Sequence, residues 1–181
     1  MESRLDTQYL DCMETMDKTE LYNLMTQYGD DVRRYAYAIT GNRQQSEDIA
    51  QEVFIKVYHH VGSFRGESSF KTWLFALTRN LAINEMKSGY MRKVILFQWV
   101  KSRGKGASAE AVFLQEHGRH ELREIIMALP VKLREVLVLH LEHEHTMAEI
   151  AKVIGVSEGT VKSRLHRARR AVEKQWKELE G

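Results

Sequence analysis

The 181-residue sequence has few features of a secreted or membrane-spanning protein. Its one cysteine, Cys12, cannot form an internal disulfide, which suits a reducing cytoplasm. Its longest apolar stretch, residues 94–100, is interrupted by Gln98 and is far shorter than the ~20 residues that span a bilayer. The acidic residues 1–20 have no apolar centre and do not resemble a secretory signal. We therefore expect a cytoplasmic protein without direct membrane insertion.

Proline and strand-like alternation are also scarce. The chain has a single proline, Pro130, and its apolar residues recur at spacings of three and four rather than two. Hydrophobic residues make up 43% of the chain, which is typical of a globular protein and excludes wholesale disorder. A chain of this length forms one domain or two small ones. The sequence predicts an all-α protein.

The net charge of +2 is the sum of zones of opposite sign. Residues 1–31 hold 2 basic and 8 acidic residues, whereas residues 32–106 hold 13 and 5. Residues 107–154 hold 5 and 8, and residues 155–181 hold 7 and 4. Two separated basic zones indicate two contacts with a polyanion, although solvated helix surface is the alternative that charge alone leaves open.

The N-terminal half carries three helical patterns. The first follows a capping-box pair, Asp17 and Glu20, and continues to Ile39. The second covers residues 44–61, and the third begins after a loop at 62–68. The residues predicted to face inward are Leu21, Leu24, Met25, Tyr28, Val32, Tyr35, Ala36 and Ile39 in the first helix, Ile49, Val53, Phe54, Val57, Tyr58 and Val61 in the second, and Phe70, Trp73, Leu74, Leu77 and Leu81 in the third.

Residues 89–118 interrupt these patterns. Their glycines and the run SRGKGASAE at 102–110 are typical of a flexible linker. Residues 90–101 are unexpectedly apolar for a linker, so they form either a short helix packed on the first domain or a segment that binds a partner. We therefore divide the chain into an acidic extension (1–18), a helical domain (19–88), a flexible linker (89–118) and a second helical domain (119–177).

The helical pattern returns at about Arg119 and ends in a helix-turn-helix. Pro130 suits the first turn of a helix, because its missing N–H would have no partner there, and Val136, Leu137 and Leu141 give that helix an inner face. The helix-turn-helix itself is marked by a capping box, a glycine in the turn and a capping serine, which are Thr146 with Glu149, Gly155 and Ser157. Residues 160–170 contain five Lys or Arg and no acid, as in a helix that reads base edges and holds phosphates.

Four stretches together resemble the extracytoplasmic-function sigma factors of bacterial RNA polymerase. They are SEDIAQEVFIKVY at 46–58, SFRGESSFKTWLFALTRNLAINEMK at 63–87, LPVKLREVLVLHL at 129–141 and MAEIAKVIGVSEGTVKSRLHRARRAV at 147–172. Their order and spacing match the family's region 2, linker and region 4. The resemblance implies a subunit that binds core polymerase, recognises the −10 and −35 promoter elements and promotes DNA melting for a stress or envelope-response regulon.

The resemblance also implies roles for individual residues. In the family, the second helix docks on a coiled coil of the polymerase clamp, which here implies Asp48, Gln51, Glu52, Phe54 and Ile55. The loop at 62–69 captures a flipped base of the −10 element and the next helix lines the melted strand, which implies Phe64, Arg65, Lys71, Arg79, Asn80 and Asn84. The last helix reads the −35 element in the major groove, which implies Lys162, Ser163, Arg164, His166 and Arg167.

The implied partners are the core polymerase (its beta and beta-prime subunits), promoter DNA and an anti-sigma factor, which in this family is often membrane-bound. The sequence departs from the family at residues 142–145, where EHEH places Glu144 near a position that is often glycine. The alternative function is a stand-alone helix-turn-helix regulator whose N-terminal half senses a ligand or dimerises, and which would bind an operator on its own.

The motifs of enzymes and metal sites are missing. His140, His143 and His145 cluster without an H-E-x-x-H pattern, and the single cysteine cannot supply a zinc-binding pair. The sequence has no phosphate-binding glycine loop and no G-x-S-x-G. We expect no metal, no cofactor and no enzymatic activity.

Overall fold

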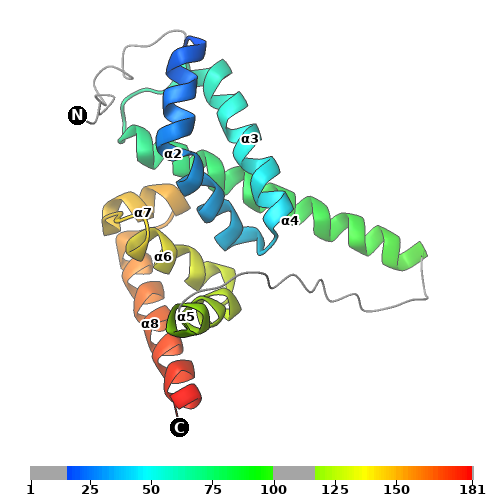
Figure 1. Cartoon of the computed structure of the whole chain (residues 1–181), viewed down its shortest axis with the longest axis vertical. Coiled ribbons are helices and arrows are strands. Elements are labelled where there is room, and N and C mark those ends of the chain that lie inside the picture. The colour runs from blue at the N-terminus through cyan, green and yellow to red at the C-terminus, as the bar shows by residue number, and fades with distance from the viewer. Residues whose placement is uncertain (1–15, 100–116, 181) are drawn as a thin grey trace.

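The computed structural model describes residues 16–99 and 117–180, and within these ranges all regular structure is helical (Figure 1). The first half contains α2 (Lys18–Thr40), α3 (Arg43–His60), the short 3₁₀ helix η1 (Val61–Ser63) and α4 (Phe70–Trp99). The second half contains α5 (His117–Ala128), α6 (Val131–Leu141), α7 (Met147–Ile154) and α8 (Glu158–Glu180). The prediction of an all-α fold is confirmed. None of the helices in the described ranges combines the length and apolar character needed to cross a membrane.

Capping side chains set the predicted helix boundaries. Asp17 accepts a hydrogen bond from the Glu20 backbone N–H at 2.8 Å, and the Glu20 carboxylate accepts one from Asp17 N–H at 2.8 Å. Thr146 and Glu149 form the same reciprocal box at the start of α7. Gly155 ends α7 with φ 68°, a left-handed backbone that glycine adopts without a steric penalty. Both capping boxes and the turn glycine of the helix-turn-helix are thus confirmed.

Helix α4 does not end where the linker was predicted to begin. It continues as one helix to Trp99, and in Figure 1 its C-terminal half extends away from the rest of the molecule. Residues 89–99 contain no proline and many residues that favour helix, so nothing in them terminates α4. Of the rest of the predicted linker, residues 117 and 118 already belong to α5, and residues 100–116 lie outside the described residues, as does the N-terminal segment 1–15 with Cys12.

The two halves of the chain share one hydrophobic core. Helices α2, α3 and α4 pack on one another, and α6 and α7 pack on α2 and α4 from the other side (Figure 1). Apolar side chains from both halves join in a single cluster, which includes Leu24, Tyr35, Leu74, Leu139 and Ile150. The two predicted domains therefore lie against each other in this structure.

Helix α6 is buried nearly all round, which its predicted inner face did not suggest. Every residue from Arg134 to Leu139 is buried, because α6 packs on α2 on one side and on α8 on another. Two residues predicted to face inward do not: Leu141 is 56% exposed at the end of α6, and Met25 is 44% exposed on α2. Both predictions are wrong, since each residue lies at the margin of its helix's apolar stripe.

The loop between α6 and α7 contains a strained residue. Glu144, exposed to solvent, has φ 54°, the one positive φ at a non-glycine position within the described residues. A side chain in this left-handed region costs about 1–2 kcal/mol. The EHEH departure thus retains the glycine-like backbone with a glutamate in its place.

Replacing Glu144 with glycine should stabilise the chain. Glycine removes the steric strain of the folded state, and this gain is larger than the free energy lost because glycine increases the conformational entropy of the unfolded chain. We therefore expect the free energy of unfolding to rise by about 0.5–1 kcal/mol. Thermal or urea denaturation measures the change. Glu142→Gly is the matched control, because Glu142 has φ −93° and glycine relieves no strain there. An equal or greater gain in the control would contradict the explanation.

Candidate functional site

The residues predicted to bind polymerase fall on two sides of α3. Asp48, Gln51 and Glu52 are exposed, and Ile55 is 58% exposed although it is apolar. Phe54 is only 4% exposed and belongs to the core. Successive residues of a helix point about 100° apart, so Phe54 and Ile55 cannot share one surface. Phe54 is therefore better described as a support for this surface than as a contact.

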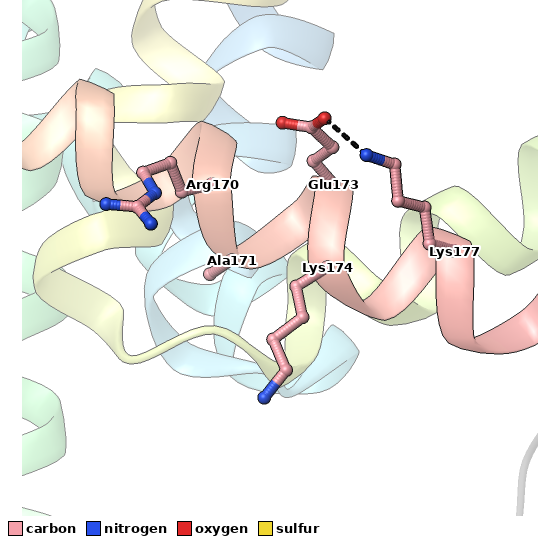
Figure 2. Close-up of a pocket in the computed structure, with 5 residues that line it drawn as sticks. All are labelled: Arg170, Ala171, Glu173, Lys174 and Lys177. Atoms are coloured by element: carbon pink, nitrogen blue, oxygen red, sulfur yellow. Dashed lines mark hydrogen bonds and ion pairs between the residues drawn. The ribbon is translucent and has the colours of Figure 1, made fainter.

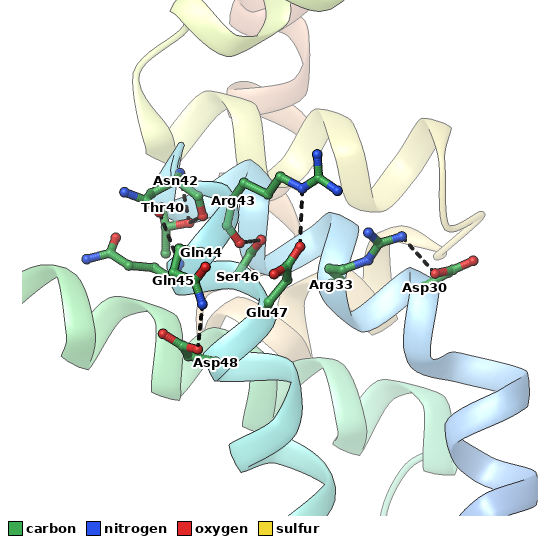
Figure 3. Close-up of polar contacts among 10 residues, drawn as sticks. All are labelled: Asp30, Arg33, Thr40, Asn42, Arg43, Gln44, Gln45, Ser46, Glu47 and Asp48. Carbon is green, nitrogen blue, oxygen red and sulfur yellow. Dashed lines mark hydrogen bonds and ion pairs between the residues drawn. The ribbon is translucent and has the colours of Figure 1, made fainter. Parts of the chain in front are cut away.

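The exposed carboxylates at the start of α3 have only local partners (Figure 3). Gln44 Nε2 donates to Asp48 Oδ1 at 3.1 Å, and Arg43 Nε lies 3.2 Å from Glu47 Oε1. One turn later, Lys56 Nζ lies 3.7 Å from Glu52. Exposed pairs of this kind contribute about 0.3–0.5 kcal/mol each. They can therefore exchange partners at little cost when a basic surface approaches.

The loop between η1 and α4 separates a buried aromatic ring from an exposed cation. Phe64 is 6% exposed, with its ring centroid 5.8 Å from that of Phe70 and 5.5 Å from that of Trp73. Arg65 is exposed beside Gly66, whose φ is 66°. The position of Phe64 in the aromatic cluster leaves no face open for stacking on a base. Arg65, rather than Phe64, is presented to a ligand of this loop.

Two cations predicted to line the −10 strand contact the other half of the chain instead. Lys71 Nζ donates to the His143 backbone carbonyl at 2.8 Å. Arg79 Nε donates to Glu135 Oε2 at 2.8 Å. Burial alone would lower the pKa of Arg79, but the hydrogen bond to Glu135 and the charges of Glu135 and Tyr35 together outweigh burial, and the pKa is raised. On the same helix, Asn80 and Asn84 are exposed.

The helix-turn-helix presents most of the predicted −35 residues to solvent. Val161, Leu165 and Ala168 are buried and fix which side of α8 faces the core. The exposed side chains on the other side are Lys162, Ser163, His166 and Arg167. Arg164 differs from them, because its side chain is 19% exposed and its Nη1 lies 3.3 Å from Glu135 Oε1.

The basic surface of α8 continues beyond the recognition segment. Arg170, Ala171, Glu173, Lys174 and Lys177 line an open hollow there (Figure 2). The Glu173 carboxylate accepts a hydrogen bond from Lys177 Nζ at 2.9 Å, which leans Lys177 toward it. The hollow thus has the chemistry of a surface that attracts an anion.

Two histidines of the 142–145 loop are buried rather than exposed. The His143 and His145 rings lie 4.7 Å and 4.9 Å from the Phe75 ring, and their buried nitrogens have no hydrogen-bond partner among the described residues. Burial is the main reason that the pKa of His143 is lowered to about 4; Asp31 opposes this shift, while the neighbouring His145, Lys71 and Arg34 contribute to it. Among the described residues, no three potential ligands converge as a metal site would require. Packing against an aromatic ring is the visible role of both imidazoles.

Comparison with known proteins matches both halves of the chain. Residues 24–90 match the family model Sigma-70 region 2, and residues 119–172 match Sigma-70, region 4. The ECF RNA polymerase sigma factor SigW of Bacillus subtilis is 30% identical over 90% of this chain and 92% of its own length. The RNA polymerase sigma-H factor of Pseudomonas aeruginosa is 29% identical over 93% and 92%.

Two solved structures share the fold. The sigma factor RpoE from Bartonella quintana, crystallised with the anti-sigma factor NepR, has a TM-score of 0.70 and 23% identity, over 88% of this chain and 98% of that one. CnrH in complex with the cytosolic domain of CnrY has a TM-score of 0.64 and 19% identity, over 94% of both chains.

Proposed function

Because this chain belongs to the extracytoplasmic-function sigma factors of bacterial RNA polymerase, we propose that three of its surfaces divide the work of promoter recognition. Such a protein directs promoter-specific initiation of transcription as a DNA-binding regulator and is not itself an enzyme. The exposed side of α3 binds core polymerase, the loop at 62–69 with α4 holds the melted −10 strand, and α8 reads the −35 element. The proposal retains the functional division at 19–88 and 119–177.

The presence of both family regions in one chain carries this conclusion. A stand-alone regulator needs only a helix-turn-helix, whereas residues 24–90 match the region 2 model. The alternative of an independent operator-binding protein is therefore not favoured.

The −10 surface is supported by the exposed polar groups around the 62–69 loop. Arg65 supplies a cation beside the strand, and Asn80 and Asn84 supply donors and acceptors one helical turn apart on α4. Phe64 holds the loop by packing on Phe70 and Trp73. Lys71 and Arg79 join this surface only when they leave their contacts with the second half of the chain.

The −35 surface is supported by the exposed face of α8. Lys162 and Arg167 are cations suited to guanine edges or phosphates, and Ser163 and His166 lie between them. Because affinity falls as salt rises, each cation that contacts a phosphate makes the slope of log affinity against log salt concentration more negative by about 0.9.

We further propose that this protein works in the cytoplasm with the polymerase and is held inactive by a protein of the anti-sigma class. The proposal is supported by the solved relatives, since RpoE is seen with NepR and CnrH with a domain of CnrY. The exposed apolar and acidic residues of α3 and the basic face of α8 are the surfaces that such a protein would have to cover.

Reconstituted transcription tests the proposal. The pure chain, added to sigma-free core polymerase and a library of genomic fragments, should start transcripts from a small subset of promoters. Ile55→Asp should lower the affinity for core at least tenfold without changing stability, because Ile55 is apolar and 58% exposed on the proposed docking surface. Tyr22→Asp is the matched control, since Tyr22 is 69% exposed but belongs to a different helix, α2. Equal losses in both variants, or no promoter-specific transcript, would contradict the assignment.

A further inference from the structure

A buried carboxylate lies between the two halves of the chain. Glu135, on α6, is 1% exposed and binds two arginines that come from elements far apart in the sequence. Arg79 of α4 contacts it through Nε at 2.8 Å and Nη2 at 3.4 Å. Arg164 of α8 contacts it through Nη1 at 3.3 Å. Charge-assisted hydrogen bonds of this kind are among the stronger polar contacts in proteins.

The two arginines belong to different DNA-binding surfaces. The family resemblance assigns Arg79 to the −10 surface and Arg164 to the −35 surface of the proposed function. The two elements are named for positions 25 base pairs apart, which at 3.4 Å per base pair is roughly 85 Å of duplex. In this structure both guanidinium groups contact the same carboxylate, so the arrangement cannot engage both elements at once.

Other contacts at the same junction cover the −10 surface. Lys71, also assigned to that surface, donates to the His143 carbonyl at 2.8 Å. Lys152 of α7 donates to the Glu67 carbonyl at 2.9 Å, within the loop that would capture a base. Lysines of each half thus donate hydrogen bonds to backbone carbonyls of the other half, across the junction where the two halves pack together.

We propose that Glu135 acts as an internal substitute for DNA, holding the free chain in a closed, autoinhibited state through Arg79 and Arg164. The carboxylate occupies the cations that nucleic acid would otherwise occupy, so DNA binding requires the junction to open. Only the open fraction of the protein is competent, and the apparent affinity for DNA is reduced by that fraction. The inference rests on the proposed function for the assignment of the two arginines, but the closed state itself can be measured without DNA.

The test compares the full-length chain with Glu135→Gln, which removes the charge and keeps the shape. In a Cys12→Ser background, dyes at Gln27→Cys on α2 and Glu158→Cys on α8 report the distance between the halves by single-molecule energy transfer. The unsubstituted Glu135 chain should show one high-transfer population, and Glu135→Gln should add a low-transfer population. Affinity for a 30-base-pair DNA duplex of mixed sequence should rise about tenfold, in step with the open fraction.

Two further variants separate opening from a general loss of charge or of fold. Glu142→Gln removes an exposed carboxylate from the residue that follows α6 and should change neither transfer nor affinity beyond about twofold. Lys152→Ala removes a different contact across the junction and should open the chain in the same direction as Glu135→Gln, by a smaller factor. If Glu135→Gln and Lys152→Ala leave the transfer distribution unchanged, or if Glu142→Gln raises affinity as much as Glu135→Gln, Glu135 does not hold the chain in a closed state.

Failure of the proposed closed state and failure of the proposed function give different results. If the chain starts promoter-specific transcription but Glu135→Gln alters neither the distance between the halves nor DNA affinity, the proposal for Glu135 is wrong and the proposed function stands. If Glu135→Gln opens the chain but no variant starts a transcript with core polymerase, the closed state is real and the functional assignment is wrong.

Discussion

Replacing Phe64 with alanine should reduce the free energy of unfolding by about 3–4 kcal/mol, as expected when a large buried aromatic ring is removed. Phe64 is 6% exposed and packs on Phe70 and Trp73, which themselves pack together with centroids 5.6 Å apart. The alanine variant leaves a cavity in this cluster and frees the loop at 62–69. Urea denaturation of the free chain measures the loss in the absence of DNA and polymerase.

Arg65→Ala is the matched comparison, since the two residues are neighbours in the same loop. Arg65 is exposed, so its removal should change stability by no more than about 0.5 kcal/mol. It should nevertheless lower the rate of promoter opening in reconstituted transcription, because the loop loses its exposed cation. If Phe64→Ala proves as stable as the parent and impairs only promoter opening, the explanation is wrong. Phe64 would then contact a base directly and would leave the core during promoter opening.

Acidification should destabilise the chain from about pH 6.5 downward. His143 is neutral in the folded chain because burial lowers its pKa to about 4, whereas the unfolded chain takes up the proton near pH 6.5. The unfolded chain therefore binds more protons over this range, and the stability present at neutral pH is lost as the pH falls through it. For His143 alone the loss is about 2 kcal/mol at pH 5. His145 acts in the same direction, since burial also lowers its pKa.

The charges around these imidazoles make the effect local to the junction. Lys71 and Arg34 face His143 and disfavour its protonation, and Asp31 favours it, with its Oδ1 3.7 Å from His143 Nδ1. A proton on His143 would place a cation beside Lys71 and within the aromatic contacts with Phe75. Opening of the two halves should therefore accompany the loss of stability.

Urea denaturation at pH 7.5 and pH 5 measures the pH dependence. His143→Leu should flatten it, because the variant has no proton to gain at this buried position. His59→Leu is the control, since His59 is exposed at the end of α3 and should leave the difference between the two pH values unchanged. If His143→Leu keeps the full pH dependence, the buried imidazole is not its origin.

The parts of the fold that could be predicted from the sequence are those governed by near neighbours. A capping box places its two members three residues apart, so Asp17 with Glu20 and Thr146 with Glu149 specify helix starts without any knowledge of packing. The turn at Gly155 follows similarly, because one residue's backbone conformation ends α7. The sequence also indicated the unusual backbone at Glu144, because the family often has glycine near this position.

The parts that could not be predicted depend on contacts between the two halves. Helical periodicity gives each helix one inner face, but α6 is covered from several directions and buries Arg134 and Glu135 as well as its apolar residues. Arg79 and Arg164 read as surface cations in their own helices, and only their shared partner shows otherwise. Phe54 belongs both to the predicted inner face of α3 and to the stretch that docks on polymerase in the family. Its burial shows that it is a core residue.

The continuation of α4 to Trp99 changes how far the two halves can move apart once they separate. Residues 89–99, as helix, advance the chain by roughly 16 Å, less than half of what the same residues would cover fully extended. The 18 steps from Trp99 to His117 can add at most about 60 Å. In the proposed function, this helix and the residues up to His117 therefore leave little spare length between surfaces that bind two promoter elements roughly 85 Å apart. Such a chain would favour promoters in which the distance between the −10 and −35 elements lies within a narrow range.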